Sequence, residues 1–396
     1  MNPVLALGLT QIIGYGALYY AFPILAPAVA QTFGRPEAHL YAVFSAGLLV
    51  GGFAAVEAGR LMDRIGAPRL MAAGSLLAAA CLWLMAAAPS FAVWAVAVIL
   101  TEVVAVAVLY DAAFAALAQL RGAGARRAIT RLTLIAGFAS TVFWPLAAWL
   151  DAAVGWRATY AIFGTLHLTI GAGLHLWLVR QSPLVGDGPL PQRPVPEAVP
   201  LPPAEVDHAF RAVAVSFALS GALVSAFGVH MVPVLAASGL AGQATLAAML
   251  VGPAQVGIRL VDALFFGRLH PLTVAAISAA ALPLSAVGLI AGAPVWLAGI
   301  LFASLFGVGQ GLASIVRGTV PLALFGRAGY GARLGRLALV RTIASAGAPF
   351  AFAAAGASLG WTGALWLFAL LGVVAAVPLV HLRARLASAG RLRPLR

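Results

Sequence analysis

Charged residues are scarce in this sequence: Asp, Glu, Lys and Arg together make up 9% of its 396 residues, whereas 63% of the residues are hydrophobic. A soluble domain carries about 25% charged residues. Because too few polar side chains remain to cover a surface that faces water, the composition excludes an aqueous fold. It indicates a chain whose solvent is lipid.

Several features of enzymes and pumps are also missing. The single cysteine, Cys81, excludes an intramolecular disulfide. The sequence has no P-loop and no cluster of His, Cys and acidic residues with the spacing of metal ligands, so we expect no enzyme activity, metal or cofactor. Apolar sequence begins at Pro3 without a basic region or cleavage site before it, so the first helix is expected to remain in the mature protein.

Lysine is absent, and 24 arginines give the chain a net charge of +13. The arginines gather in every second loop between apolar runs, while the alternate loops hold only Arg35 and Arg157. This is the pattern of membrane topology rather than of a nucleic-acid-binding face. It predicts a multi-pass protein of the bacterial inner membrane, with both termini in the cytoplasm and no nucleic-acid partner.

Twelve apolar runs are long enough to cross a bilayer as helices, since one crossing takes about 20 residues. A proline-rich polar stretch, residues 181–208, separates six runs from six and is expected to be an extended cytoplasmic linker. We predict an all-α integral membrane protein with two pseudo-symmetric six-helix bundles, residues 1–180 and residues 209–396 with a short basic tail. The expected spans are 3–33, 39–59, 70–88, 91–120, 129–151, 156–179, 209–237, 241–267, 272–291, 295–325, 335–356 and 361–382.

The two halves repeat short motifs. Gly155-Trp156 opens the last run of the first half, and Gly360-Trp361 opens the last run of the second half. The repetition favours an internal duplication, which is how transporters with a site near the middle of the membrane are often built.

The loop after the second run reads GRLMDRIGAPR from Gly59 onward. Its order of glycine, Asp-Arg, glycine and a basic residue resembles the signature of the major facilitator superfamily, and the division into six and six runs resembles that family over the whole chain. The resemblance implies secondary transport by alternating access. It also implies that Gly59, Asp63, Arg64 and Gly66 form a cytoplasmic latch that helps to hold the outward-facing state, with a plain topology loop as the alternative.

Three arginines, Arg259, Arg317 and Arg341, fall inside the eighth, tenth and eleventh runs. Each costs roughly 2.5–3.5 kcal/mol at the centre of a bilayer, so each needs water, a partner or a ligand. Gln255 shares a helix face with Arg259, and Gln310 shares one with Arg317. Because a planar guanidinium suits bidentate capture of a carboxylate or phosphate, we predict that these five residues bind an organic anion.

Arginines on the eighth and eleventh helices are also similar to the arrangement in the oxalate/formate antiporter and monocarboxylate transporter branch of the superfamily. This resemblance rests on helix number and depth, and it implies that Arg259 and Arg341 bind the carboxylate of the substrate. The alternative is structural: Arg259 pairs with Asp262, and Arg317 or Arg341 stabilises a helix end.

The first half holds two acids and a polar stripe within its apolar runs. Glu102 and Asp111 lie nine residues apart on the fourth run, so we expect them to point to roughly opposite faces, with at most one directed into a central cavity. Either acid is a candidate for proton coupling, with pairing to an arginine as the alternative. Gln11, Tyr15 and Tyr19 recur every four residues, which predicts a face that binds solute or packs against another helix.

Three functions fit these residues. The first is a monomeric secondary transporter that moves a small organic anion through the lipid bilayer, driven by protons or by a counter-substrate. The second is proton-coupled efflux of lipophilic or cationic drugs, which arginines inside the membrane would oppose by repelling a cation. The third is a membrane sensor or scaffold that does not transport, for which arginines inside the membrane would not be required. The arginines favour the first.

Overall fold

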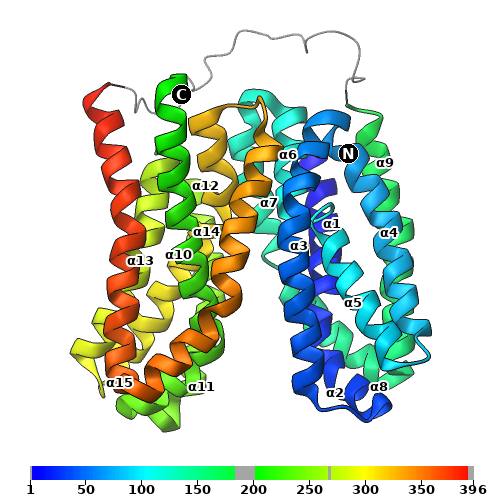
Figure 1. Ribbon diagram of the computed structural model, residues 1–396, viewed down its shortest axis with the longest axis horizontal. Helices are drawn as coiled ribbons and strands as arrows, with labels where there is room; N and C mark the ends of the chain where they lie inside the picture. The colour runs from blue at the N-terminus through cyan, green and yellow to red at the C-terminus, as the bar shows by residue number, and fades with distance from the viewer. Residues whose placement is uncertain (1, 183–200, 266–268, 391–396) are drawn as a thin grey trace. The chain divides into compact units, whose positions relative to one another are not determined.

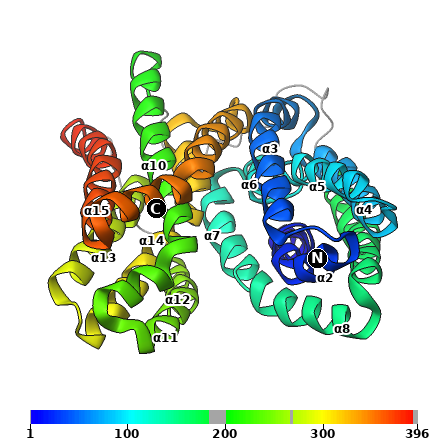
Figure 2. The same ribbon diagram turned by 60° about the horizontal axis from the view of Figure 1, so that its bottom comes forward.

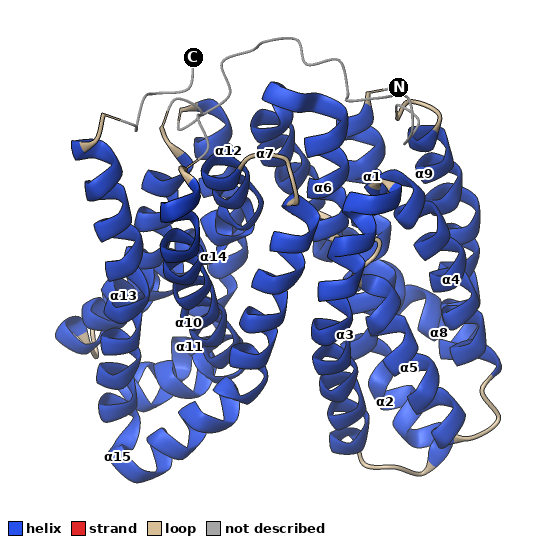
Figure 3. Cartoon of the chain, turned by 45° about the horizontal axis from the view of Figure 1, so that its top comes forward, coloured by secondary structure: helices blue, strands red, loops and turns tan. Residues whose placement is uncertain are grey.

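The computed structural model describes residues 2–182, 201–265 and 269–390 of the chain, and this described part contains helices and short loops but no strand (Figure 3). Nine helical stretches within it are long and apolar enough to cross a membrane. The all-α, multi-pass class predicted from the sequence is therefore confirmed. The core of the predicted linker, residues 183–200, lies outside the described residues.

Three of these nine stretches are much longer than one crossing needs. Each contains one glycine with a positive φ, at 80° for Gly155, 85° for Gly239 and 70° for Gly360. Such a backbone conformation is easy for glycine alone and breaks a helix sharply, so each stretch holds two helices. Twelve crossings fit this arrangement. The three stretches are Ala125–Val179, Pro203–Met249 and Tyr330–Ser388.

The first compact unit contains residues Met1–Pro196 together with Arg327–Leu339. Figure 1 shows its helices from blue to green. They are α1 (Pro3–Tyr15), a π-helical turn (Gly16–Tyr20), α2 (Ala21–Phe33), α3 (Glu37–Ile65), α4 (Ala67–Ala87), α5 (Phe91–Ala105), α6 (Tyr110–Arg121), a 3-10 turn (Gly122–Gly124), α7 (Ala125–Ala136), α8 (Ala139–Leu166), a second π-helical turn (His167–Gly171) and α9 (Ala172–Val179).

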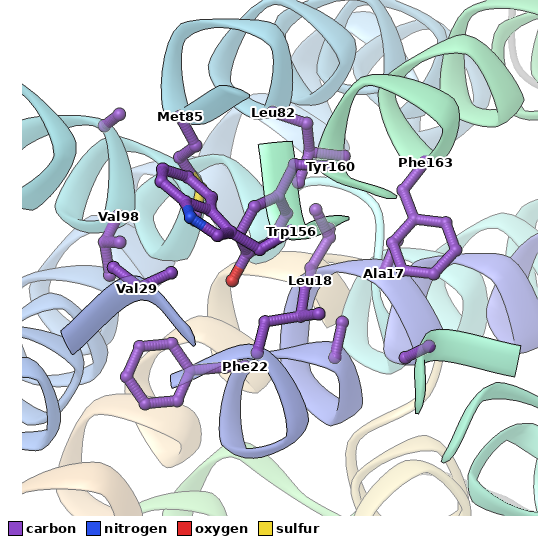
Figure 4. Packing of buried hydrophobic residues seen from close by; sticks show 14 of the residues in the cluster. Ala17, Leu18, Phe22, Val29, Leu82, Met85, Val98, Trp156, Tyr160 and Phe163 are labelled. Atoms are coloured by element: carbon purple, nitrogen blue, oxygen red, sulfur yellow. The ribbon is translucent and has the colours of Figure 1, made fainter. Parts of the chain in front are cut away.

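Aromatic side chains fill the inside of this unit. Phe22, Trp94, Tyr160 and Phe163 are each at most 4% exposed, and Figure 4 shows Tyr160 between Leu82, Met85 and Leu18. Large apolar side chains also point outward, for example Trp149 at 65% exposure. Lipid solvates such side chains as well as a protein core does, so close packing rather than the hydrophobic effect holds the helices together.

The fourth run does not form one continuous helix. Its helix α5 ends at Ala105 and α6 begins at Tyr110, and the four residues between them are not helical. The argument that Glu102 and Asp111 face opposite sides assumed a continuous helix and was wrong in that premise. The amide nitrogen of Gln11 donates to the carbonyl of Val108 at 2.7 Å and so satisfies one backbone group freed by the break.

The second unit contains residues Glu197–Gly326 and Val340–Arg396. Its long helix α15 begins in the segment that belongs to the first unit. The elements are α10 (Pro203–Leu235), a π-helical turn (Ala236–Leu240), a 3-10 turn (Ala241–Gln243), α11 (Ala244–Met249), α12 (Val251–Leu264), α13 (Pro271–Gly292), α14 (Trp296–Phe325) and α15 (Tyr330–Ser388).

Glycines on α14 allow its neighbours to approach closely, and α14 lies beside α12 and α13 in both views (Figures 1 and 2). A methyl group at Gly307 would lie 2.6 Å from the carbonyl oxygen of Val251, and one at Gly311 would lie 2.8 Å from that of Gln255. Backbones this close bring polar side chains of α12 and α14 together.

Candidate functional site

The polar side chains of α12 and α14 form a short seam inside the second unit. The amide nitrogen of Gln255 donates to the amide oxygen of Gln310 at 2.6 Å. One turn further, Nε of Arg259 donates to the carbonyl oxygen of Gly311 at 3.4 Å, and the hydroxyl of Ser314 donates to the same carbonyl at 2.7 Å. The structure therefore brings together three of the residues predicted to bind solute: Gln255, Arg259 and Gln310.

Arg259 is 8% exposed and Asp262 is 4% exposed, so both are buried in this seam. Asp262 is also the only acidic residue in the sequence after Asp207, whereas the same part of the chain contains the intramembrane arginines Arg259, Arg317 and Arg341. One carboxylate cannot neutralise three guanidinium groups. The helices of the second unit therefore carry an excess of positive charge.

Arg341 lies against the neighbouring helix α10. A methyl group at Gly221 would lie 2.6 Å from Cγ of Arg341 and 2.9 Å from the hydroxyl of Ser345. Because Gly221 has no side chain, the side chain of Arg341 can pack against α10 at this position. Arg341 and Arg317 are both half-buried. Arg317 lies on α14, and it follows Ser314 by three residues.

In the first unit, Glu102 lies on α5 and is 5% exposed. Its side chain fits beside α3, where a methyl group at Gly47 would lie 3.0 Å from Cγ of Glu102 and one at Gly51 would lie 2.8 Å from its backbone oxygen. Glu102 lines a small cavity with Phe22, Phe44 and Tyr160 among others. Every residue that lines the cavity belongs to the first unit.

The residues predicted to form a latch meet the first turn of α15. The two carboxylate oxygens of Asp63 accept hydrogen bonds from the backbone N–H groups of Gly331, at 2.9 Å, and Ala332, at 2.8 Å. Gly59 permits the contact, because a methyl group there would lie 2.2 Å from the carbonyl oxygen of Gly331. Asp63 therefore caps a helix N-terminus, where unpaired N–H groups and the helix dipole favour a negative charge.

The other latch residues surround this cap. Gly66 has a φ of 90° and ends α3 in a sharp turn. Gln119 of α6 clamps the turn, since its amide accepts from the backbone of Ala67 at 2.8 Å and donates to the carbonyl of Met62 at 2.9 Å. Arg64 is exposed.

Asp111 lies close to the same place. It lines a second small cavity in the first unit, together with Gly59, Met62, Gly331 and Gly335. Its carboxyl is thus near the cap of α15, on the other side of the helix break from Glu102.

The stripe predicted on the first run does not share one environment. Gln11 is fully buried, Tyr15 is half-buried and Tyr19 is 41% exposed. The π-helical turn at Gly16–Tyr20 sets Tyr19 apart from the two earlier residues, because one extra residue in a turn rotates the next side chains about the helix axis.

Sequence reasoning missed four contributors to these sites. Tyr160 and Gly221 act through neighbours far away in the sequence, and Gly331 and Ala332 bind Asp63 through backbone groups. The small residues at every fourth position, Gly47, Gly51, Ala55 and Gly59, were the available signal for close helix contact on α3. No signal in the sequence pairs Glu102 with Tyr160.

Comparisons with known proteins agree with this fold. The family model of the Major Facilitator Superfamily matches residues 7–283. The chain resembles the outward conformation of FucP, an E. coli fucose:proton symporter, with a TM-score of 0.70 and 14% identity over 96% of this chain and 98% of that one. It resembles the human organic anion transporter MFSD10 with a TM-score of 0.69 and 15% identity over 96% and 100% of the two chains.

A third solved structure, the proton:xylose symporter XylE, has a TM-score of 0.60 and 14% identity over 94% of each chain. A comparison with curated protein sequences gave no match. At identities of 14–15%, the likeness to solved structures concerns the fold alone.

Proposed function

Because this chain belongs to the major facilitator superfamily, we propose that it is a secondary active transporter that carries a small organic anion across a bacterial inner membrane by alternating access. The family makes it a transporter of small molecules rather than an enzyme. Three points belong to the proposal: the solute is an organic anion, protons drive its transport, and the membrane is the bacterial inner membrane.

The observation that carries the proposal is the charge of the second unit. Beyond Asp207 the sequence holds three arginines within its apolar runs but one acidic residue, Asp262. An excess of charge within a membrane is costly, and an anionic solute would remove that cost when it binds. A cation would be repelled by the same arginines, which argues against the efflux of cationic drugs.

We assign the main contacts to Arg341 and Arg259. Arg341 is half-buried along α10 and can present its guanidinium to a carboxylate, which a planar fork binds bidentately. Arg259 is more deeply buried and is held by the carbonyl of Gly311, and the Gln255–Gln310 pair adds amide groups beside it. Arg317 is the third positive group.

We assign Tyr15 and Tyr19 to the solute as well, since Tyr19 is exposed and Tyr15 is half-buried. Gln11 was predicted to bind solute, but its amide nitrogen is used at the break between α5 and α6. We therefore give Gln11 a supporting role.

Proton coupling is the second part of the proposal, and Glu102 is its carrier. The residues that line the cavity of Glu102 include no positively charged side chain that would keep its carboxyl ionised. A carboxyl group in such an apolar cavity can take up and release a proton. Asp111, beside the cap of α15, is the second candidate. FucP and XylE are proton symporters and MFSD10 is an organic anion transporter, which is consistent with such a carrier.

The orientation follows from the arginine-rich loops of the sequence, which place both termini in the cytoplasm. One chain supplies both the anion-binding arginines and the proton carrier, so we propose a monomer. The latch residues Gly59, Asp63, Arg64 and Gly66 would favour one of the two access states through the cap on α15.

A thermal-stability screen of the purified protein tests the proposal. We expect carboxylates or other organic anions to raise the melting temperature, while sugars and cationic drugs do not. Arg341→Ala should weaken binding of the stabilising anion by about 10- to 100-fold, because a charge-assisted hydrogen bond contributes about 1.5–3 kcal/mol.

The matched control is Arg385→Ala, which removes an exposed arginine from the same helix. It should bind the anion like the wild type. Stabilisation by a sugar or a cationic drug, with no response to anions, would contradict the anion assignment. No response to any class would favour the sensor or scaffold.

A further inference from the structure

The cavity beside Glu102 is almost entirely apolar. Its walls come from the π-helical turn at Gly16–Tyr20 and from α2, α3, α4, α5 and α8 of the first unit. Ten residues line it, and seven of them are apolar. It has room for on the order of one water molecule and is too small for an organic solute.

Three of the lining residues carry hydrogen-bonding groups. The hydroxyl of Thr101 is engaged with the carbonyl of Ala97 at 2.8 Å and the sulfur of Met85 at 3.5 Å. The hydroxyl of Tyr160 is fully buried, and no described residue hydrogen-bonds it. The carboxyl of Glu102 likewise has no hydrogen-bond partner among the described residues. Two buried polar groups thus share one cavity, and each lacks a hydrogen-bond partner in the described part of the chain.

Leaving both groups unpaired would be costly. A buried hydroxyl or carboxyl without a hydrogen bond is less stable than one that is paired, because it has given up its hydrogen bonds to water. The same cavity offers a remedy, since a phenol can donate to a carboxylate oxygen and can also accept from a protonated carboxyl. A single water between them would do the same in both protonation states.

We propose that Tyr160 is a positioning residue for Glu102, and that the two form a proton-binding site enclosed by the helices of the first unit. The phenol hydroxyl holds the carboxyl through one water, since no direct hydrogen bond joins the two side chains in the structure. The proton adds to a carboxylate oxygen, and no other bond changes. The proposal rests on the proton coupling assigned to Glu102 above, and it adds that the site takes a proton but no solute.

The other helices packed around Glu102 present few ionisable groups to it. From α3 the neighbours are Gly47, Gly51 and Phe44, and from the π-helical turn and α2 the lining is apolar. From α4, Cys81 lies beside Thr101. From α8, Tyr160 lines the same cavity as Glu102, and Asp151 is within electrostatic range of that tyrosine. Tyr160 is therefore the donor that the cavity itself provides.

Infrared spectroscopy of the protein in liposomes, recorded through a pH titration without any solute, tests this site. We expect the wild type to show the C=O stretch of a buried protonated carboxyl, and Glu102→Gln to lose that band. Tyr160→Phe should move the band to higher wavenumber, because the water that donates to the C=O oxygen is no longer held by the phenol, and a C=O group that accepts no hydrogen bond is stiffer.

Tyr110→Phe is the matched control, since Tyr110 is a buried tyrosine of the same unit that does not line the cavity. It should leave the band in place. A wild-type band that stays in Glu102→Gln, or a Tyr160→Phe spectrum identical to the wild type, would overturn the proposal. Melting curves of all variants confirm that each one is folded.

Transport measurements separate this proposal from the proposed function. If Glu102→Gln loses the band but still accumulates solute in response to a pH gradient, then proton coupling does not run through Glu102. The Glu102–Tyr160 site would stand in that case, because its spectral signature was measured without solute.

Discussion

Individual residues divide the work between the two units. Glu102, the candidate proton carrier, lies in an apolar cavity of the first unit, whereas Arg259 and Arg341, the candidate anion ligands, lie in the second. A proton and an anion would therefore meet different side chains.

The position of Arg341 depends on one glycine. Gly221→Ala would place a methyl group 2.6 Å from Cγ of Arg341, so the arginine has to move although its charge is unchanged. We expect this variant to weaken anion binding by about tenfold, which equals ~1.4 kcal/mol, in a thermal-shift titration.

Gly228→Ala is the control for that prediction. Gly228 lies on the same helix, and a methyl group there meets no atom within 4 Å. The control should bind the anion like the wild type. Equal affinity of the Gly221→Ala and Gly228→Ala variants would show that Arg341 does not need this place on α10.

Single-residue roles were the hardest part to predict from the sequence. The arginines were found because charge inside an apolar run is conspicuous. Tyr160 was not found, because its hydroxyl matters only through a cavity that it shares with Glu102, which lies 58 residues earlier in the chain. The spacing of Gln11, Tyr15 and Tyr19 predicted one shared helix face, but the π-helical turn moves Tyr19 away from the environment of the other two.

Among the elements, α3 connects two of the sites. Small residues recur every four positions along it, at Gly47, Gly51, Ala55 and Gly59, and the series ends at Asp63. The first two contact Glu102 and its backbone, and the next two contact the first turns of α15. A change at Glu102 can therefore reach the cap of α15 through one rigid helix.

The cap itself gives a testable prediction. Asp63→Asn removes the negative charge that faces two N–H groups of α15, which we expect to cost roughly 0.3–1 kcal/mol. Hydrogen exchange followed by mass spectrometry should show faster exchange in the peptide that contains Gly331 and Ala332.

Glu57→Gln serves as its control. Glu57 also lies on α3, but its carboxylate forms an exposed ion pair with Arg60 at 2.9 Å instead of capping α15. Exchange near Gly331 should be unchanged in this variant. If Asp63→Asn exchanged no faster than Glu57→Gln, the cap would have no measurable role in holding the start of α15.

The contact between α12 and α14 can be tested in the same way. Gly311→Ala would place a methyl group 2.8 Å from the carbonyl oxygen of Gln255, and backbone atoms cannot move aside cheaply. We expect a loss of about 1–3 kcal/mol in stability and weaker anion binding, because the seam at Arg259 opens.

A comparison with Gly257→Ala isolates the effect of the contact. Gly257 lies on α12, where a methyl group meets no atom within 4 Å, so its melting temperature and anion affinity should not fall. A Gly311→Ala variant with wild-type stability would mean that α12 and α14 are not locked together at this point.

For the whole molecule, the sequence was sufficient to predict the membrane class and the all-helical fold, because length and apolarity of a run decide whether it can cross lipid. It predicted the family from the loop at Gly59–Gly66 and the layout of the runs. It could not predict that Arg327–Leu339 groups with the first unit, because that depends on Asp63 binding backbone groups 268 residues away. The break between α5 and α6 also escaped prediction, since its sequence is as apolar as a helix.

The central claim is that the molecule carries an organic anion held by the arginines of its second unit. Counterflow exchange of the stabilising anion in proteoliposomes tests it most directly, with wild type, Arg341→Ala and Arg385→Ala compared at equal protein density. The account predicts exchange by the wild type and by Arg385→Ala, and at least about tenfold slower exchange by Arg341→Ala at low anion concentration. Exchange by Arg341→Ala at the wild-type rate would contradict it.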